Sequence, residues 1–150
     1  MTTQNSIEIL LLVSTSLTTG FVVFATGVYQ KIMNGVDEAT FKILLAELSK
    51  NALKSPFIIG LSLVTMLGMV PYFYYGGLSN IWFTAGLALW IITSIIAKMT
   101  RLPIYKRVGD LDSSETIQLR AERERLNRTS ILNAGLSITI VLLMVIGLLF

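Results

Sequence analysis

The chain has 150 residues, 53% of them hydrophobic, and its twelve Lys and Arg residues against nine Asp and Glu give a formal net charge of +3. It contains no Cys and no His, which excludes disulfide bonds, thiolate catalysis, zinc sites and haem or copper held by His. We therefore expect no metal site and no cofactor. The basic residues flank apolar runs and are interleaved with acids, so the expected partners are anionic lipid headgroups rather than nucleic acids.

Four apolar runs of about 20 residues are long enough to cross the ~30 Å hydrocarbon core of a bilayer. All basic residues fall between these runs, in Lys31–Lys54 and Lys98–Arg128. Four crossings put both stretches on one side of the membrane, and short loops rich in Lys and Arg stay cytoplasmic. The sequence thus predicts a multi-pass membrane protein with segments 30–55 and 100–128 in the cytoplasm and both termini outside.

The first span is predicted over residues 9–29. Small and hydroxyl-bearing residues recur in it at helical spacing, which usually lets helices approach closely and satisfy one another's hydrogen bonds. Ser16 and Gly20 form a small-x-x-x-small pair suited to such packing. An alternative, a stripe that faces a ligand or lines the pore of an oligomeric channel, is open for Thr15, Thr19 and Thr26.

The segment after the first span predicts an amphipathic helix over residues 37–53. Its apolar residues follow the i, i+3, i+4, i+7 spacing of one helix face, at Phe41, Leu44, Leu45 and Leu48. Two placements are open for this helix. It lies flat in the inner headgroup zone with its apolar face in the membrane, or it caps the bundle as a lid.

The second and third spans are predicted over residues 56–73 and 81–99, joined by a short outer turn. Glycines in these spans are expected to form the close contacts between helices that small residues permit. The positions are Gly60, Gly68 and Gly86.

The second charged segment contains the start of another helix. Asp112 with Glu115 resembles a capping box, so we predict a helix that begins near Ser113. No Gly or Pro follows before Gly135, and the helix should run without a break into the fourth span, 129–150. The fourth span therefore has a predicted cytoplasmic helical extension.

A few polar or amphipathic side chains mark a candidate ligand site. Trp90 lies about 12 Å below the outer interface, and its indole N–H needs a partner in the bundle or on a ligand. Asn133 lies about 7.5 Å along the helix from Arg128, with Ser137 one turn further on. Interhelical hydrogen bonds are the structural interpretation. The functional one is a pocket that opens toward the cytoplasm with Asn127 and Arg128 at its mouth.

Short motifs in all four spans resemble a known family. They are Gly20–Phe24, Ser55–Phe57, Thr100–Tyr105 and Leu126–Thr129, and together they resemble the anthrone oxygenase-like family of small four-span membrane proteins. The resemblance implies a transmembrane four-helix bundle. In some fungal members it also implies oxidation of a polycyclic anthrone to an anthraquinone without an established metal.

Only a small part of that family's pattern carries over to individual residues. Asn127 and Arg128 match a recurrent feature, with Pro103 and Tyr105 as neighbours. The chain differs from many members in having no His, and nearby Arg and Leu residues stand where a Trp often precedes the Asn-Arg pair.

The expected fold is all-α, a polytopic transmembrane four-helix bundle that forms a single membrane domain over residues 1–150. No charged residue falls near the middle of a span, which argues against an ion-driven transporter. We expect a non-catalytic accessory or scaffold subunit of a membrane complex or homo-oligomer. The alternative is an oxygenase-like enzyme, or a binder of a hydrophobic ring compound that enters from the inner leaflet.

Overall fold

A computed structural model of the protein describes residues 3–52 and 54–150, and within these residues all regular structure is helical. The all-α prediction is confirmed. In chain order the elements are α1 (Thr3–Phe24), the π-helical turn η1 (Ala25–Tyr29), α2 (Gln30–Asn34), α3 (Glu38–Ala52), α4 (Pro56–Tyr74), the 3-10 turn η2 (Gly77–Ser79), α5 (Ile81–Asp110) and α6 (Thr116–Leu149).

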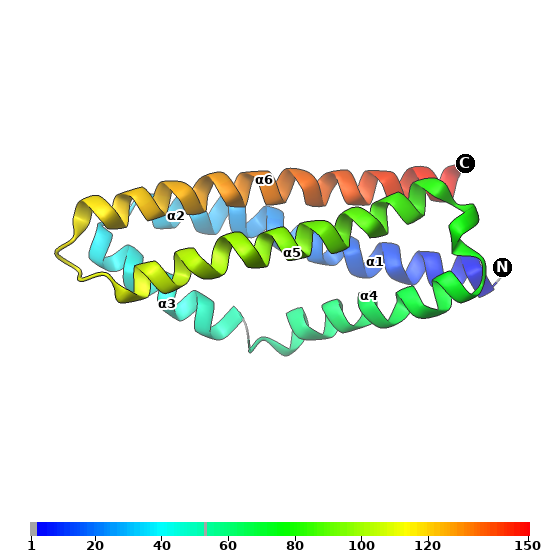
Figure 1. Ribbon diagram of the computed structural model, residues 1–150, viewed down its shortest axis with the longest axis horizontal. Helices are drawn as coiled ribbons and strands as arrows, with labels where there is room; N and C mark the ends of the chain where they lie inside the picture. Colours follow the sequence, from blue (N-terminus) through cyan, green and yellow to red (C-terminus); the bar gives the residue numbers. More distant parts are fainter. Residues whose placement is uncertain (1–2, 53) are drawn as a thin grey trace.

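Four helical segments are long and apolar enough to span a membrane: Thr3–Asn34, which joins α1, η1 and α2, and the helices α4, α5 and α6. They form an elongated bundle (Figure 1). The chain termini and the α4–α5 turn lie at one end, here called the terminal end, and the α2–α3 turn and the α5–α6 loop lie at the opposite loop end (Figure 1). An even number of crossings requires this arrangement.

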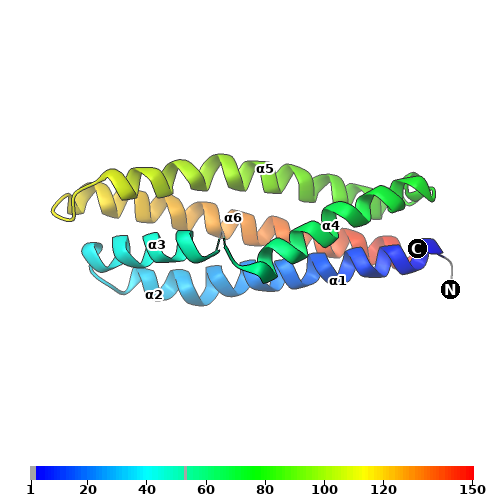
Figure 2. The same cartoon turned by 90° about the horizontal axis from the view of Figure 1, so that it is seen from below.

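Helices α3 and α4 follow one another along the bundle (Figure 2). α3 lies beside α2 at the loop end, while α4 packs mainly on α1. α4 reaches α5 close to the turn that joins them, where the hydroxyls of Tyr72 and Thr84 are 3.0 Å apart. The bundle therefore has two sections in sequence, with α4 in one and α3 in the other.

Each section has a hydrophobic core of its own. The core at the terminal end joins α1, α4, α5 and α6 through Leu11, Met69, Tyr72, Phe83, Leu87, Ile140 and Met144. The core at the loop end joins α2, α3, α5 and α6 through Met33, Phe41, Leu45, Ile104, Val108, Leu119 and Leu126.

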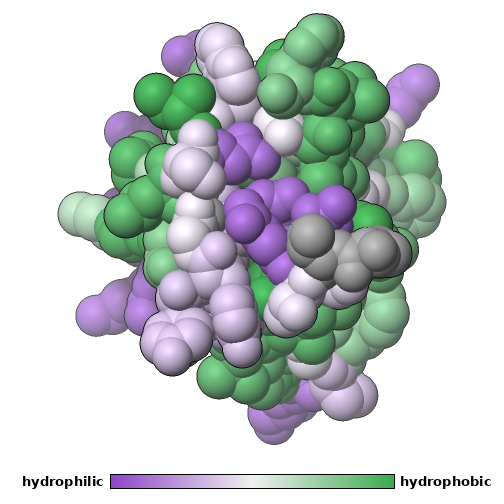
Figure 3. Space-filling model, turned by 90° about the vertical axis from the view of Figure 1, so that its right-hand side faces the viewer, coloured by the Kyte–Doolittle hydropathy of each residue, from purple (hydrophilic) through white to green (hydrophobic). Residues whose placement is uncertain are grey.

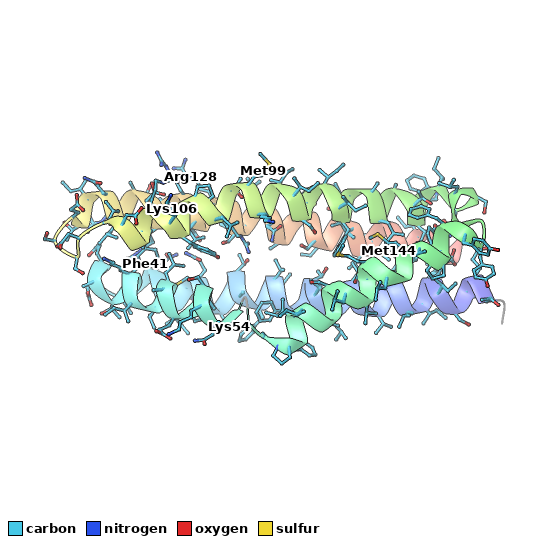
Figure 4. All side chains as sticks on the ribbon, turned by 60° about the horizontal axis from the view of Figure 1, so that its bottom comes forward. Phe41, Lys54, Met99, Lys106, Arg128 and Met144 are labelled. Carbon is cyan, nitrogen blue, oxygen red and sulfur yellow. The ribbon has the colours of Figure 1, made fainter. Side chains whose placement is uncertain are left out.

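The predicted amphipathic helix is present as α3, and its packing differs from both placements left open by the sequence. Phe41 and Leu45 are buried, whereas Leu44 and Leu48 are half-buried. Figure 4 shows Phe41 on the side of α3 that faces the rest of the bundle. The apolar face is thus covered by other helices, and α3 runs along the bundle as its fourth helix at the loop end.

The segment expected as a loop after residue 99 is largely helical, because α5 continues to Asp110. Pro103 lies inside this helix, where a proline normally costs about 3 kcal/mol. Ile104 and Val108, on the next turns, are buried in the loop-end core. We attribute the continued helix to this burial, which the sequence pattern alone did not reveal.

The helix predicted to begin near Ser113 begins three residues later, at Thr116. Half of the expected capping box is present, since the Asp112 N–H donates to Glu115 Oε2 over 2.7 Å, but the residue that precedes the helix is Glu115, which makes no side-chain cap. The Asp112 carboxylate accepts from the N–H and the hydroxyl of Ser114, which makes a turn before the helix starts. From Thr116 the helix is continuous to Leu149, as predicted.

Helices α5 and α6 are longer than a membrane crossing. Their 30 and 34 residues correspond to about 45 Å and about 51 Å at 1.5 Å per residue, against ~30 Å of hydrocarbon. The first helical segment also exceeds its prediction of 9–29 at both ends, running from Thr3 to Asn34. In each case the helix passes the apolar run and continues into polar sequence.

Candidate functional site

The glycines expected at helix contacts fall into two groups. A Cβ added at Gly86 would lie 2.7 Å from Met144 Cγ and 3.1 Å from the Ile140 carbonyl oxygen, and one at Gly68 would lie 2.9 Å from a methyl group of Leu11. These two positions require a small residue. Gly20 and Gly60 have nothing within 4 Å of the added Cβ, and Ser16 near Gly20 is half-buried.

Hydroxyl groups on α1 and on the π-helical turn η1 form hydrogen bonds with neighbouring helices. Ser14 and Thr65 on α4 share a hydrogen bond of 2.9 Å between their side-chain oxygens. Two threonines of the predicted stripe donate to carbonyl oxygens of α6, Thr19 to Ser137 and Thr26 to Ser130, each over 3.3 Å. For Thr19 and Thr26 these bonds correspond to the packing interpretation of the stripe, whereas the hydroxyl of the buried Thr15 has no hydrogen-bond partner among the described residues.

A polar cluster lies at the terminal end. Its centre is Asn80, whose amide nitrogen donates to the Gly147 carbonyl oxygen over 2.8 Å and to Glu8 Oε1 over 3.3 Å. The Asn80 amide oxygen caps α5 by accepting from the Phe83 N–H. Glu8 is only 5% exposed and also accepts from Gln4. Figure 3 shows hydrophilic residues at the centre of this end face.

The structure encloses the Glu8 carboxylate between helices at the terminal end. Gly147 is part of the reason, because a Cβ there would lie 2.7 Å from both Asn80 Oδ1 and the Phe83 nitrogen. Sequence reasoning missed Asn80 and Gly147. An Asn directly before a helix start is an N-cap signal that could have pointed to the first.

The loop end is held by charged side chains around its core. The carboxylate of Glu122 on α6 is buried and accepts two hydrogen bonds from the Arg107 guanidinium, from Nε over 2.9 Å and from Nη2 over 3.0 Å. It also accepts a hydrogen bond from Arg125 over 2.8 Å. Arg120 bridges to Glu38 on α3 over 3.1 Å. These contacts tie α6 to α5 and to α3.

Further contacts fix α3 in place. The guanidinium carbon of Arg123 lies 4.6 Å from the centre of the Phe41 ring, and its Nη2 donates to the Asp37 carbonyl oxygen. The Lys42 ammonium donates to the Leu111 carbonyl oxygen in the α5–α6 loop. The N-terminal half of α3 is thus held against α6 and the α5–α6 loop.

Three carboxylates at the loop end have lowered pKa values. Hydrogen bonds from the side chain and the backbone N–H of Thr40 lower the pKa of Asp37. A backbone hydrogen bond and Arg120 lower that of Glu38, and hydrogen bonds from Ser114 lower that of Asp112. All three carboxylates are stabilised in the charged form.

Two residues of the predicted cytoplasmic mouth line different surface grooves. Asn127 lines a groove near the α2–α3 turn, beside Asp37 and Arg123. Arg128 lines another groove with Met99 and Thr129. Figure 4 shows Arg128 and Met99 on the outward side of the α5–α6 pair, away from α3. The structure therefore does not bring Asn127 and Arg128 to one opening.

The deeper residues of the candidate site have structural neighbours. Trp90 is half-buried and packs against the terminal-end core. The Ser137 hydroxyl donates to the Asn133 carbonyl oxygen one turn earlier, over 2.8 Å. Asn133 itself is half-buried.

A partly open cavity of about 60 Å³ lies where the two sections meet, and the π-helical turn η1 forms part of its wall. Apolar side chains such as Phe21 and Leu48 form one part of the lining. Among the polar lining residues are Gln30, Arg101 and Tyr105. π-Helical turns occur frequently at functional sites, so we take this cavity as the candidate ligand site.

The polar groups at the cavity differ in how well they are bonded. Gln30 is 3% exposed and its amide reaches Asn34 only at 3.5 Å. Arg101 Nε is buried and has no hydrogen-bond partner within the described part of the chain. Sequence reasoning did not select Gln30 or Arg101. For Arg101 a signal was available, because this basic residue lies about 30 Å along the helix from Ile81, which is the thickness of the hydrocarbon core of a bilayer.

The comparisons with known proteins do not add a function. No protein-family model and no curated protein matches the sequence, and no solved structure matches the fold.

Proposed function

We propose that the protein is a multi-pass membrane protein with both termini outside and the loop end in the cytoplasm. All basic residues belong to Lys31–Lys54 and Lys98–Arg128, the two stretches that the bundle brings together at and next to the loop end. The energetic cost of moving these charges across hydrocarbon retains them on the cytoplasmic side. Anionic lipids of that leaflet are the expected neighbours of the basic residues.

We propose further that it acts as a non-catalytic accessory or scaffold subunit in a membrane complex or homo-oligomer. The observation that carries this proposal is the continuity of α5 and α6, which run about 15 to 20 Å beyond the length of a membrane crossing. This extra length lies in the loop-end section, which has its own hydrophobic core and its own ion pairs. Such a section is a rigid helical platform attached to membrane spans. Its charged exterior suits the docking of another polypeptide at the membrane surface.

Gentle extraction tests the scaffold role. The tagged protein, purified in a mild detergent and measured by native mass spectrometry, should appear with other polypeptides or as a homo-oligomer. A Glu122→Gln variant, which removes one carboxylate that orders the platform, should show a smaller associated fraction. A wild-type protein that is monomeric at every detergent concentration would contradict the proposal.

The absence of cysteine from the sequence gives a direct test of orientation. Ser79→Cys and Ser113→Cys place one thiol at exposed positions of the terminal end and the loop end. A membrane-impermeant maleimide should label the first in intact cells and the second only after lysis. The opposite pattern would reverse the proposed orientation.

The second candidate function is binding or oxidation of a hydrophobic ring compound, suggested by the resemblance to the anthrone oxygenase-like family. One observation favours it, because Tyr105 from the resembling segment lines the cavity. The cavity volume of about 60 Å³ is room for only a few water molecules. A fused ring system would require a much larger opening, so we rank this candidate second.

A further inference from the structure

The cavity at the junction of the two sections lies at a defined depth. Arg101 on α5 is about 30 Å along the helix from Ile81, and Ser130 on α6 is about 30 Å from Phe150, both at 1.5 Å per residue. This distance equals the thickness of the hydrocarbon core. Two helices thus independently place the cavity at the level of the headgroups on the loop-end side.

The residues that line the cavity carry a positive charge and no negative charge. The lining contains the Arg101 guanidinium, and none of its residues is an acid. This arrangement contrasts with the other arginines near it in the fold, since Arg107 and Arg125 both pair with Glu122. Arg101 forms no salt bridge in the part of the chain that the structure describes, and its buried Nε lacks a hydrogen-bond acceptor.

A buried donor without an acceptor costs about 1–3 kcal/mol, and a guanidinium is suited to bind a phosphate with two parallel hydrogen bonds. Other donors lie nearby, because Gln30 and Tyr105 line the same cavity. Their side chains offer an amide and a phenolic O–H to a second oxygen of the same group. The cavity volume is sufficient for part of a headgroup and insufficient for a ring system.

Most of the remaining wall is apolar, and on the side of Phe21 it continues to the outer surface of the bundle. Phe21 lines the cavity and is 41% exposed on α1, and Phe24, one turn further, is exposed on the same helix. An acyl chain can lie along this surface while the headgroup remains at the polar end. The occupant that fits both parts is an amphiphile with an anionic head and an apolar tail.

We propose that the junction cavity is a specific site for one anionic phospholipid of the loop-end leaflet, with its phosphate on Arg101 and an acyl chain along Phe21. The inference rests on the proposed membrane insertion, but not on the scaffold role or on which side is cytoplasmic. A bound lipid here would connect α1, α5 and the C-terminal part of α3. It would supply the acceptor that Arg101 lacks.

Native mass spectrometry of the detergent-purified full chain tests the site, with phosphatidylglycerol and phosphatidylcholine added separately. The wild-type protein should retain one phosphatidylglycerol in preference to phosphatidylcholine. Arg101→Gln should weaken this binding about tenfold, the value of one charge-assisted hydrogen bond. Arg128→Gln removes the same charge from an exposed position outside the cavity and serves as the matched control.

A second variant separates loss of the site from loss of the fold. Ala25→Leu adds apolar bulk to the cavity wall without removing charge, and it should also abolish retention of phosphatidylglycerol while Trp fluorescence and helix content stay native. Equal retention by wild type, Arg101→Gln and Ala25→Leu would overturn the proposal. So would equal retention of both lipids, or displacement of phosphatidylglycerol by millimolar inorganic phosphate, which would indicate a site for a free anion.

Discussion

Replacing single glycines by alanine measures how closely the helices approach one another. A glycine in a helix interior is about 1 kcal/mol less favourable than alanine, so every such substitution carries a similar gain from helix propensity. At Gly20 nothing lies within 4 Å of the added Cβ, and Gly20→Ala should stabilise the fold by up to about 1 kcal/mol. Gly20→Ala is therefore the reference variant for the positions where the added Cβ would be in close contact with another helix.

At Gly147 and Gly86 the added Cβ meets other atoms. In Gly147→Ala it would lie 2.7 Å from the Phe83 backbone nitrogen, which cannot move without shifting α5. In Gly86→Ala the nearest atom, at 2.7 Å, belongs to the flexible Met144 side chain, and the Ile140 carbonyl oxygen is at 3.1 Å. Overpacking costs about 1–3 kcal/mol. Gly147→Ala should be at the upper end and Gly86→Ala nearer the middle.

The measurable quantity is the difference from the reference, since the propensity gain cancels. Titration with a denaturing detergent, followed by the fluorescence of the two tryptophans, gives the free energy of unfolding of each variant. Gly147→Ala and Gly86→Ala should be about 1–3 kcal/mol less stable than Gly20→Ala. If the three variants unfold together, the close approach of α5 and α6 is not what holds the terminal end, and the packing argument fails.

Three further changes test the polar contacts. Asn80→Ala removes the α5 cap and the donor to Glu8, and should lower the free energy of unfolding in the same titration by about 2 kcal/mol. An unchanged midpoint would show that the polar cluster at the terminal end is not ordered. Glu122→Gln should cost about 1–2 kcal/mol, discounted because its arginine partners are half-exposed, with increased protease cleavage near the α5–α6 loop as a second readout. Because the pKa of Asp37 is lowered in the folded state, the stability that its carboxylate contributes is present above about pH 4. This stability is lost as the pH falls through the lowered pKa. At low pH the wild type should therefore lose protection against hydrogen exchange in the first turn of α3, measured against the intrinsic exchange rate at the same pH, whereas Asp37→Asn should not.

The sequence predicted the helical elements well where apolar periodicity or run length was strong. The four apolar segments and the amphipathic helix around Phe41 were all found, and the span over 56–73 agrees with α4 within one residue. Helix ends were predicted less well. Pro103 is normally a boundary signal, but tertiary burial of Ile104 and Val108 keeps α5 helical beyond it.

The candidate site was harder to predict, because it depends on which helix faces meet. Asn127 and Arg128 are adjacent in sequence, so on a helix they point about 100° apart, and the structure assigns them to different grooves. The π-helical turn at Ala25–Tyr29 rotates the face of the first segment just before Gln30. No residue pattern predicts a π-helical turn, and so the cavity beside it could not be derived from the sequence.

The change of side-chain chemistry along α5 and α6 explains why the chain needs α3. Between Ile81 and Met99 the exposed residues of α5 are mostly apolar, which suits hydrocarbon, whereas from Leu102 to Asp110 they include Lys106, Arg107 and Asp110. Two helices alone cannot enclose a core in water, because each has an apolar stripe that must be covered. α3 supplies that cover through Phe41 and Leu45, while α4 supplies it at the terminal end. The break between α3 and α4 therefore falls near the level at which charged residues begin to appear among the exposed side chains of α5, and the junction cavity lies at that same level.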